Sequence, residues 1–165
     1  MPFTNTQSIV AADLNNMWRG LYRDNTDHAH TGNTNETDLA SVSITGGTIT
    51  ATGGLHVLAA GTTTTAGGTK RVRLYFGATA IGDTTAVTGT GDWFFEAWIY
   101  NTAANAQRCL VLWSTHNSAT NFNQDYITAA IDTASAVTLK CTGLLAAGGD
   151  TVTQTMFDVS IIQIT

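Results

Sequence analysis

The sequence predicts a mainly β protein, in which a short N-terminal helix and an extended arm precede an antiparallel β-sandwich. Charged residues make up only 12% of the 165-residue chain, about half the share found in an average globular protein. The polar remainder is mostly Thr, Asn, Ser and Gln, together with 16 Gly. Thr favours pleated strands, and Gly and Asn favour the turns that join them. After residue 55, apolar and polar residues alternate with a period of two, which indicates half-buried strands.

The expected helix covers about residues 11–24. Leu14, Met17, Trp18 and Leu21 recur at three- and four-residue spacing, which would gather them into one apolar stripe on a helix. An isolated helix of about four turns is marginal in water. We therefore expect the stripe to pack either on the rest of its own chain or on the same stripe of two symmetry-related chains.

Regular patterns fade in residues 25–54, where weak alternation in residues 39–52 predicts an extended arm or a short β-hairpin. We therefore divide the chain into an N-terminal region, residues 1–54, and a head domain, residues 55–165. The N-terminal region would contain an anchoring arm, the short helix and a His-containing loop.

The head domain has the pattern of a jelly roll. In residues 70–76, Val72, Leu74 and Phe76 share one face and alternate with polar residues. Further strands are expected at residues 93–100, 108–113, 126–131, 137–144 and 152–164. Turn signals rich in Gly, Asp and Asn separate about seven or eight strands. A β-sandwich or jelly roll is the arrangement that buries one face of so many strands.

Charge and hydropathy exclude several classes of partner. Seven Lys and Arg against twelve Asp and Glu give a net charge of −5, so the basic footprint of a nucleic-acid-binding protein is missing. Apolar runs fall short of the roughly 18 residues that insertion across a membrane needs. The N-terminus lacks the pattern of a signal peptide. We therefore expect neither nucleic acid nor a membrane as a partner, and synthesis in a cytoplasm.

The two cysteines, Cys109 and Cys141, both lie in apolar alternating runs. Buried free thiols are the favoured interpretation, because free Cys is among the most buried residue types. A disulfide stays open, since the sequence does not show whether the two strands are neighbours.

The most informative local feature is the pair His28 and His30. Side chains two residues apart on an extended segment point the same way, and neutral imidazole is a common ligand for iron, nickel and zinc. One pair leaves most of a coordination shell empty, whereas three chains around a threefold axis would supply six nitrogens. The alternative is that both histidines are solvated loop residues.

Candidate catalytic groups do not converge in the sequence, so no enzymatic activity is expected. A glycosidase needs two carboxylates beside one bond, and nothing in the pattern pairs Glu96 with Asp125. Cys109 and His116 lie too far apart along one strand for a thiol–imidazole pair. Glu36 follows the histidine pair at the wrong spacing for a cupin metalloenzyme, and the glycine-rich turns lack a phosphate-binding loop.

Two aromatic residues, Trp113 and Tyr126, flank an Asn-rich stretch and are candidates for stacking on a sugar ring. The competing interpretation is that aromatic residues on alternating strands fill the core of the sandwich. Both interpretations stay open at this point.

The N-terminal region resembles the entry segments of tailed-phage fibre, spike and decoration proteins. The resemblance covers residues 12–44 and rests on the run from Leu14 to Met17, the run from Asp27 to Gly32 and the pair Ser43-Ile44. The stretches 91–97 and 157–162 are similar to the jelly-roll heads of such proteins. Many of these relatives have Asp where this chain has Thr31.

The resemblance implies a structural protein that forms homotrimers on the surface of a phage particle after assembly in the host cytoplasm. Capsid decoration, or cement, and head-fibre roles are favoured. A receptor-binding tail fibre or spike tip that recognises a host glycan is the alternative, and a free carbohydrate-binding module is a remote one. The implied partners are further copies of the chain and other virion proteins of the capsid or tail. In trimeric relatives, paired histidines from three chains hold a metal, which would be the role of His28 and His30.

Overall fold

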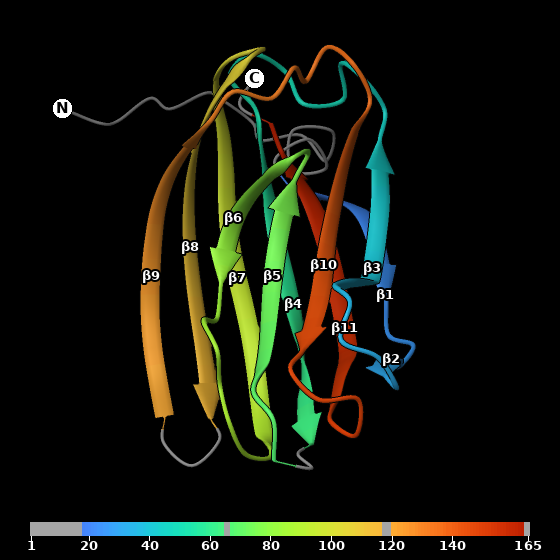
Figure 1. Cartoon of the computed structure of the whole chain (residues 1–165). Coiled ribbons are helices and arrows are strands. Elements are labelled where there is room, and N and C mark those ends of the chain that lie inside the picture. Colours follow the sequence, from blue (N-terminus) through green and yellow to red (C-terminus); the bar gives the residue numbers. More distant parts are fainter. Residues whose placement is uncertain (1–17, 65–66, 117–119, 164–165) are drawn as a thin grey trace, which may run out of the picture.

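The computed structural model describes residues 18–64, 67–116 and 120–163, which form two antiparallel β-sheets packed face to face (Figure 1). The larger sheet contains β1 (Trp18–Asp24), β2 (His28–Thr31), β4 (Gly54–Thr64), β7 (Gly91–Ala103), β8 (Ala106–His116), β9 (Thr120–Ala129) and β11 (Thr151–Ile162). The smaller sheet contains β3 (Thr37–Ile44), β5 (Lys70–Phe76), β6 (Thr79–Asp83) and β10 (Val137–Leu145). This arrangement confirms the mainly β class and the β-sandwich.

The strand order joins the two ends of the described chain. The seven-stranded sheet runs β1-β11-β4-β7-β8-β9, with β2 also paired to β11, and the four-stranded sheet runs β3-β10-β5-β6. Trp18 at the start of β1 pairs with Ile162 at the end of β11. Because β1 and β2 pair with β11 and β3 pairs with β10, the described part of the N-terminal region is built into the same sandwich as the head.

The predicted helix over residues 11–24 is wrong for its described part, because residues 18–24 form strand β1. Leu14 and Met17 lie outside the described residues, and Trp18 is the first residue of the strand. The register of β1 on β11 shifts between Gly20 and Tyr22, and such a bulge breaks the alternation of side chains.

The bulge lets two adjacent residues, Leu21 and Tyr22, both pack against the core. The ring of Tyr22 meets that of Phe157 edge to face, with centroids 6.0 Å apart. Apolar neighbours in sequence that share one side of a bulged strand do not show a period of two. The spacing in this segment therefore resembles that of a helix.

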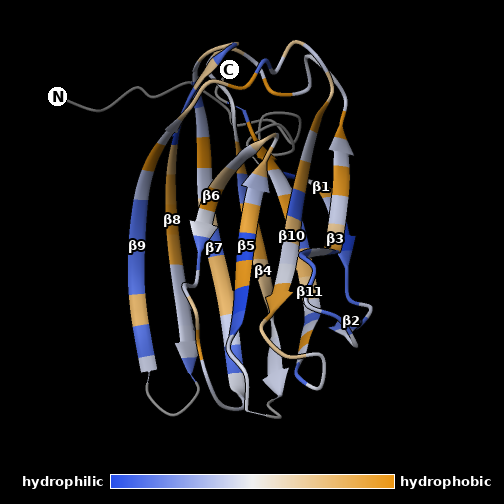
Figure 2. Cartoon of the chain, viewed as in Figure 1, coloured by the Kyte–Doolittle hydropathy of each residue, from blue (hydrophilic) through white to orange (hydrophobic). Residues whose placement is uncertain are grey.

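The core lies between the two sheets and is built by alternation. Val72, Leu74 and Phe76 of β5 are buried, as predicted, and Figure 2 shows apolar and polar positions alternating along this strand. Cys109 of β8 and Cys141 of β10 come from opposite sheets, and both are buried free thiols. The favoured interpretation of the sequence is confirmed, and the two residues form no disulfide with each other.

The interior becomes polar towards the end of the sandwich that holds β2. Gln154, Trp93 and Thr115 are aligned there on β11, β7 and β8, and each is buried with a side-chain polar atom that has no partner among the described residues. Lys70, the first residue of β5, and Asp150, which immediately precedes β11, are also fully buried. The Nζ atom of Lys70 lies 3.6 Å from Oδ1 of Asp150. This polar layer is the environment into which β2 inserts one of its histidines.

Candidate functional site

The most prominent surface feature is an exposed apolar face on the larger sheet. Five large apolar side chains are exposed among the described residues, and all five lie on the side of this sheet that points away from the smaller one. They are Tyr100, Leu110, Phe122, Tyr126 and Met156. Phe122 and Tyr126 are the most open, at 62% and 64% exposed. Inward-pointing residues such as Ile99 and Cys109 alternate with them and are buried.

Strand register gathers these residues into a continuous patch. One row across the strands contains Trp98, Leu110 and Tyr126. The next two contain Leu58 with Leu112, and Met156 with Phe122 in the row that also includes Phe94. Phe94 borders a pocket described below and is kept apart from the others. The name outer apolar face is given to eight residues on this side of the sheet: Tyr100, Trp98, Leu110, Tyr126, Leu58, Leu112, Met156 and Phe122. With strands about 4.8 Å apart and alternate residues about 6.8 Å apart, three rows across five strands cover roughly 400–500 Å², and the apolar side chains share this area with polar ones such as Glu96, Gln124 and Ser114.

A polar pair lies in the middle of the outer apolar face. His56 Nε2 is 2.9 Å from Glu96 Oε1, and the ring of His56 packs on that of Trp98 with centroids 5.3 Å apart. Only 10% of the His56 side chain is exposed, against 31% for Glu96. At one edge of the sheet, Arg23 Nε donates to Asp158 Oδ2 at 2.6 Å. The face therefore combines an apolar surface with a few fixed polar groups.

The predicted glycan contacts, Trp113 and Tyr126, lie on opposite faces of the larger sheet. Trp113 is only 5% exposed, and its Nε1 donates a hydrogen bond to Asp125 Oδ2 at 2.9 Å. The indole of Trp113 therefore belongs to the core, as the competing interpretation of the sequence expected, and its polar edge is already bonded. Tyr126 remains available on the outer apolar face.

The carboxylates considered for catalysis are separated in the same way. Glu96 lies on the outer side of β7, whereas Asp125 lies on the inner side of β9 beside Trp113. Cys109 points into the core, and His116 is exposed at the end of the same strand. The sheet thus keeps these groups apart.

The predicted metal ligands, His28 and His30, lie on β2 and point to the same side of it. His28 Nε2 is 2.8 Å from Asp24 Oδ2. The backbone N–H of Thr26 and then the ring of His28 lower the pKa of Asp24 below its usual value. His30 is only 3% exposed, and its Nε2 has no partner among the described residues.

Within the described part of one chain, no group of three or more His, Cys, Asp or Glu side chains is placed to hold a metal ion. His28 and His30 differ in access, since the first is half-buried at the surface and the second is enclosed. A metal shared between three chains stays a prediction.

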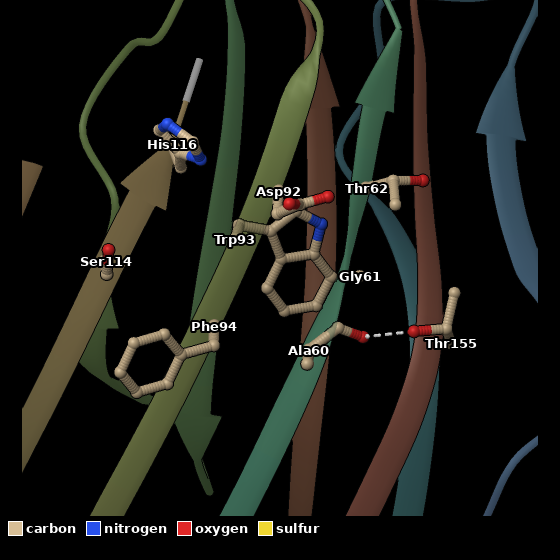
Figure 3. Close-up of a pocket in the computed structure, with 9 residues that line it drawn as sticks. All are labelled: Ala60, Gly61, Thr62, Asp92, Trp93, Phe94, Ser114, His116 and Thr155. Atoms are coloured by element: carbon tan, nitrogen blue, oxygen red, sulfur yellow. Dashed lines mark hydrogen bonds between the residues drawn. The ribbon is translucent and has the colours of Figure 1, made fainter. Parts of the chain in front are cut away.

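A pocket of about 380 Å³ opens at one end of the larger sheet, beside the outer apolar face (Figure 3). Its lining comes from four neighbouring strands, β11, β4, β7 and β8. The residues are Ala60, Gly61, Thr62, Asp92, Trp93, Phe94, Ser114, His116 and Thr155. Two aromatic residues, Trp93 and Phe94, border this space together with polar side chains such as Asp92, Ser114 and His116.

The sequence contains a signal for the outer apolar face that alternation alone did not use. Residues 93–95, 98–100 and 110–113 are apolar at consecutive positions. Since successive side chains of a strand point to opposite faces, such runs place apolar groups on both faces of β7 and β8. A strand that is apolar on both sides is expected where both sides are covered.

No protein-family model matches the chain, and no curated protein matches it either. The described residues include no helix of the length and hydropathy that crossing a membrane requires.

Proposed function

We propose that this chain is a structural, non-enzymatic protein that forms homotrimers on the surface of a tailed-phage particle, as a capsid decoration or head-fibre protein. The observation that carries the proposal is the outer apolar face, where all the large exposed apolar side chains of the described residues gather. Three further supports are the low charge, the resemblance of residues 12–44 and the two antiparallel sheets, which suit a jelly-roll head.

The outer apolar face has the composition of an interface between copies of the same chain. The centres of homo-oligomer interfaces are apolar and rich in aromatic residues, with polar groups around them. A stable interface buries about 800 Å² on each partner. The roughly 400–500 Å² of this face would form the centre of such an interface, and charged neighbours such as Arg23 and Arg108 would form its rim.

The central polar pair favours a partner that can match it. His56 and Glu96 are bonded to each other, but the Glu96 carboxylate keeps further acceptor positions, so a partner that covers the pair must supply a hydrogen-bond donor there. The exposed rings of Phe122 and Tyr126 on edge strand β9 extend the contact to the border of the sheet. In a trimer, each chain would use this surface against its two neighbours.

Sedimentation of the purified protein tests the assembly. We expect a mass about three times 17.4 kDa at micromolar concentration. Leu110→Lys and Tyr126→Lys each place a charge on the outer apolar face and should give folded monomers. The matched control is Thr138→Lys, at an exposed position of β10 on the smaller sheet, which should remain trimeric. A monomeric parent, or equal behaviour of all three variants, would contradict the proposal.

Electron microscopy and mass spectrometry of purified phage particles test the location. We expect the chain at regular positions on the capsid surface in multiples of three copies. Its absence from particles would exclude the virion role while leaving the oligomeric state as measured. Its presence only at the tail would exclude the decoration and head-fibre roles and leave a tail fibre.

A further inference from the structure

We infer that the pocket beside Phe94 binds one neutral sugar ring of a glycan. The inference deepens the proposed function, on which it rests, because it gives the particle-bound protein a second partner besides its own copies. Five observations carry it: the volume of the pocket, its aromatic wall, its uncommitted polar groups, its charge and its place in the fold.

The pocket has the size and form of a site for a small ligand. Its volume of about 380 Å³ lies near the lower end of the range for ligand sites in proteins, about 300–1,000 Å³. The lining residues come from strands rather than loops, so the hydrogen-bonded sheet fixes their positions. The pocket is open on its outer side, which allows a bound ring to continue into a longer glycan.

The ring of Phe94 supplies an apolar wall. Phe94 lies on the outer side of β7, and Figure 3 shows its ring directed towards Ser114 on the neighbouring strand. Sugar rings carry C–H groups on their faces and hydroxyl groups around their edges. An aromatic side chain covers such an apolar face, and polar side chains around it can bond the hydroxyl groups.

Polar side chains stand around that wall. Asp92 and His116 face each other across β7 and β8, and Ser114 is the partner of Phe94 in the same register. Among the described residues, the side chains of Asp92, Ser114 and His116 make no hydrogen bond or ion pair with one another or with other groups. Their donors and acceptors are therefore open to a ligand, whereas the Thr155 hydroxyl already donates to the Ala60 carbonyl at 3.3 Å.

The charge of the lining selects between neutral and anionic ligands. The carboxylate of Asp92 accepts hydrogen bonds from hydroxyl groups but repels phosphate, sulfate and carboxylate groups. Lys and Arg are missing from the described residues that line the pocket, so none of these residues offers a permanent positive charge to an anionic ligand. Neutral hexoses and their N-acetyl derivatives are the class that matches the pocket.

The pocket lies at the end of the sandwich away from the chain entry point. Trp18 and Ile162 meet at one end of the larger sheet, while Asp92 near the start of β7 and His116 at the end of β8 lie at the other (Figure 1). A protein anchored through residues 1–17 would therefore present the pocket away from its anchor. That direction is the one from which a glycan on another surface would approach.

Saturation-transfer NMR on the assembled protein tests the inference directly. The probes are the methyl glycosides of glucose, galactose, mannose and N-acetylglucosamine, with methyl glucuronide as an anionic comparison. We expect transfer to the ring protons of at least one neutral probe and a much weaker signal for the glucuronide. Phe94→Ala and Asp92→Asn should each weaken binding at least tenfold, whereas Phe94→Tyr should retain it.

The matched control is Tyr75→Ala, which removes a ring from β5 of the smaller sheet, outside both the pocket and the outer apolar face, and which should bind as the parent does. Sedimentation and circular dichroism of every variant separate a lost site from a lost fold or a lost trimer. Absence of transfer from all neutral probes to the folded parent would overturn the inference. Unchanged binding in both Phe94→Ala and Asp92→Asn would also overturn it. Sugar binding by a parent that is monomeric would contradict the trimer instead.

Discussion

The Asp83 carboxylate, at the end of β6, is the most heavily bonded acidic group in the smaller sheet. Arg71 donates to it through Nε at 2.6 Å, Arg73 donates through Nε at 3.0 Å, and the backbone N–H of Thr85 donates at 2.8 Å. Burial alone would raise the pKa of Asp83, but these donors outweigh it and lower the pKa below the ordinary value of 3.8. Asp83 thus links the edge strand β6 to its neighbour β5.

Asp83→Asn should therefore destabilise the fold at neutral pH, by about 1–2 kcal/mol, because the charge-assisted hydrogen bonds are weakened. A carboxylate with a lowered pKa stabilises the fold above its unfolded-state pKa, and this contribution is lost as the pH falls through the folded value. Urea denaturation at pH 7 and below pH 3.8 measures both effects. The gap between parent and variant should shrink in acid, and a gap independent of pH would contradict the role of the charge.

The two cysteines give a second prediction at the scale of single residues. Burial raises the pKa of Cys109 to about 11 and raises that of Cys141 further, so both remain protonated thiols at neutral pH. Since the thiolate is the reactive form, a thiol reagent should label neither residue in the folded protein. Both should react once the chain is unfolded in guanidinium. Rapid labelling of the folded chain at pH 8 would show that the sandwich opens around one of them.

At the scale of elements, the two sheets lie close together at Gly82 of β6. A Cβ atom there would come within 2.9 Å of both the Phe95 ring and the Val111 side chain, and real side chains do not approach so closely. Gly82→Ala should thus separate β6 from β7 and β8 and cost about 1–3 kcal/mol.

The matched control for Gly82→Ala is Ala80→Val, because Ala80 is exposed on the same strand. Adding methyl groups there meets solvent rather than the opposite sheet, and a β-branched residue suits a strand. The control should unfold at nearly the same urea concentration as the parent. If both variants lose equal stability, the strand itself and not the contact between sheets is sensitive.

At the scale of the whole molecule, the assembly decides whether His28 and His30 serve a metal. The His30 ring is buried inside the sandwich, so His30→Ala would remove core packing whether or not a metal binds. His28→Ala is the cleaner test, because this side chain contacts Asp24 near the surface and its loss should leave the fold intact.

If three chains share an iron, nickel or zinc ion, elemental analysis of the purified trimer should give about one metal per three chains. The metal should be lost in His28→Ala, together with some thermal stability of the trimer. Asn25→Ala, at an exposed position between β1 and β2, serves as a control for a general effect on this edge of the sheet. A metal-free parent trimer would leave His28 as the partner of Asp24 and nothing more.

The sequence by itself determined the class of the fold and much of its core. A strand that buries one side has apolar residues at every second position, and this pattern can be seen in the sequence of a single segment. Val72, Leu74 and Phe76 are an example, and all three are buried. The buried free state of Cys109 and Cys141 followed from the same local pattern. Turn residues rich in Gly and Asn fixed roughly where each strand ends, since they favour backbone conformations that strands avoid.

Only the tertiary structure decided how these strands combine. Residues 18–24 became a strand because β11 offers a partner for their backbone and a bulge places Leu21 and Tyr22 together on the core, and neither condition is local in sequence. The pocket beside Phe94 likewise needed the register that joins β4, β7, β8 and β11. A one-residue shift in any pairing would exchange the two faces of a strand. The observed register places Trp113 in the core and Tyr126 on the surface. The sequence alone left both residues as candidates for stacking on a sugar ring.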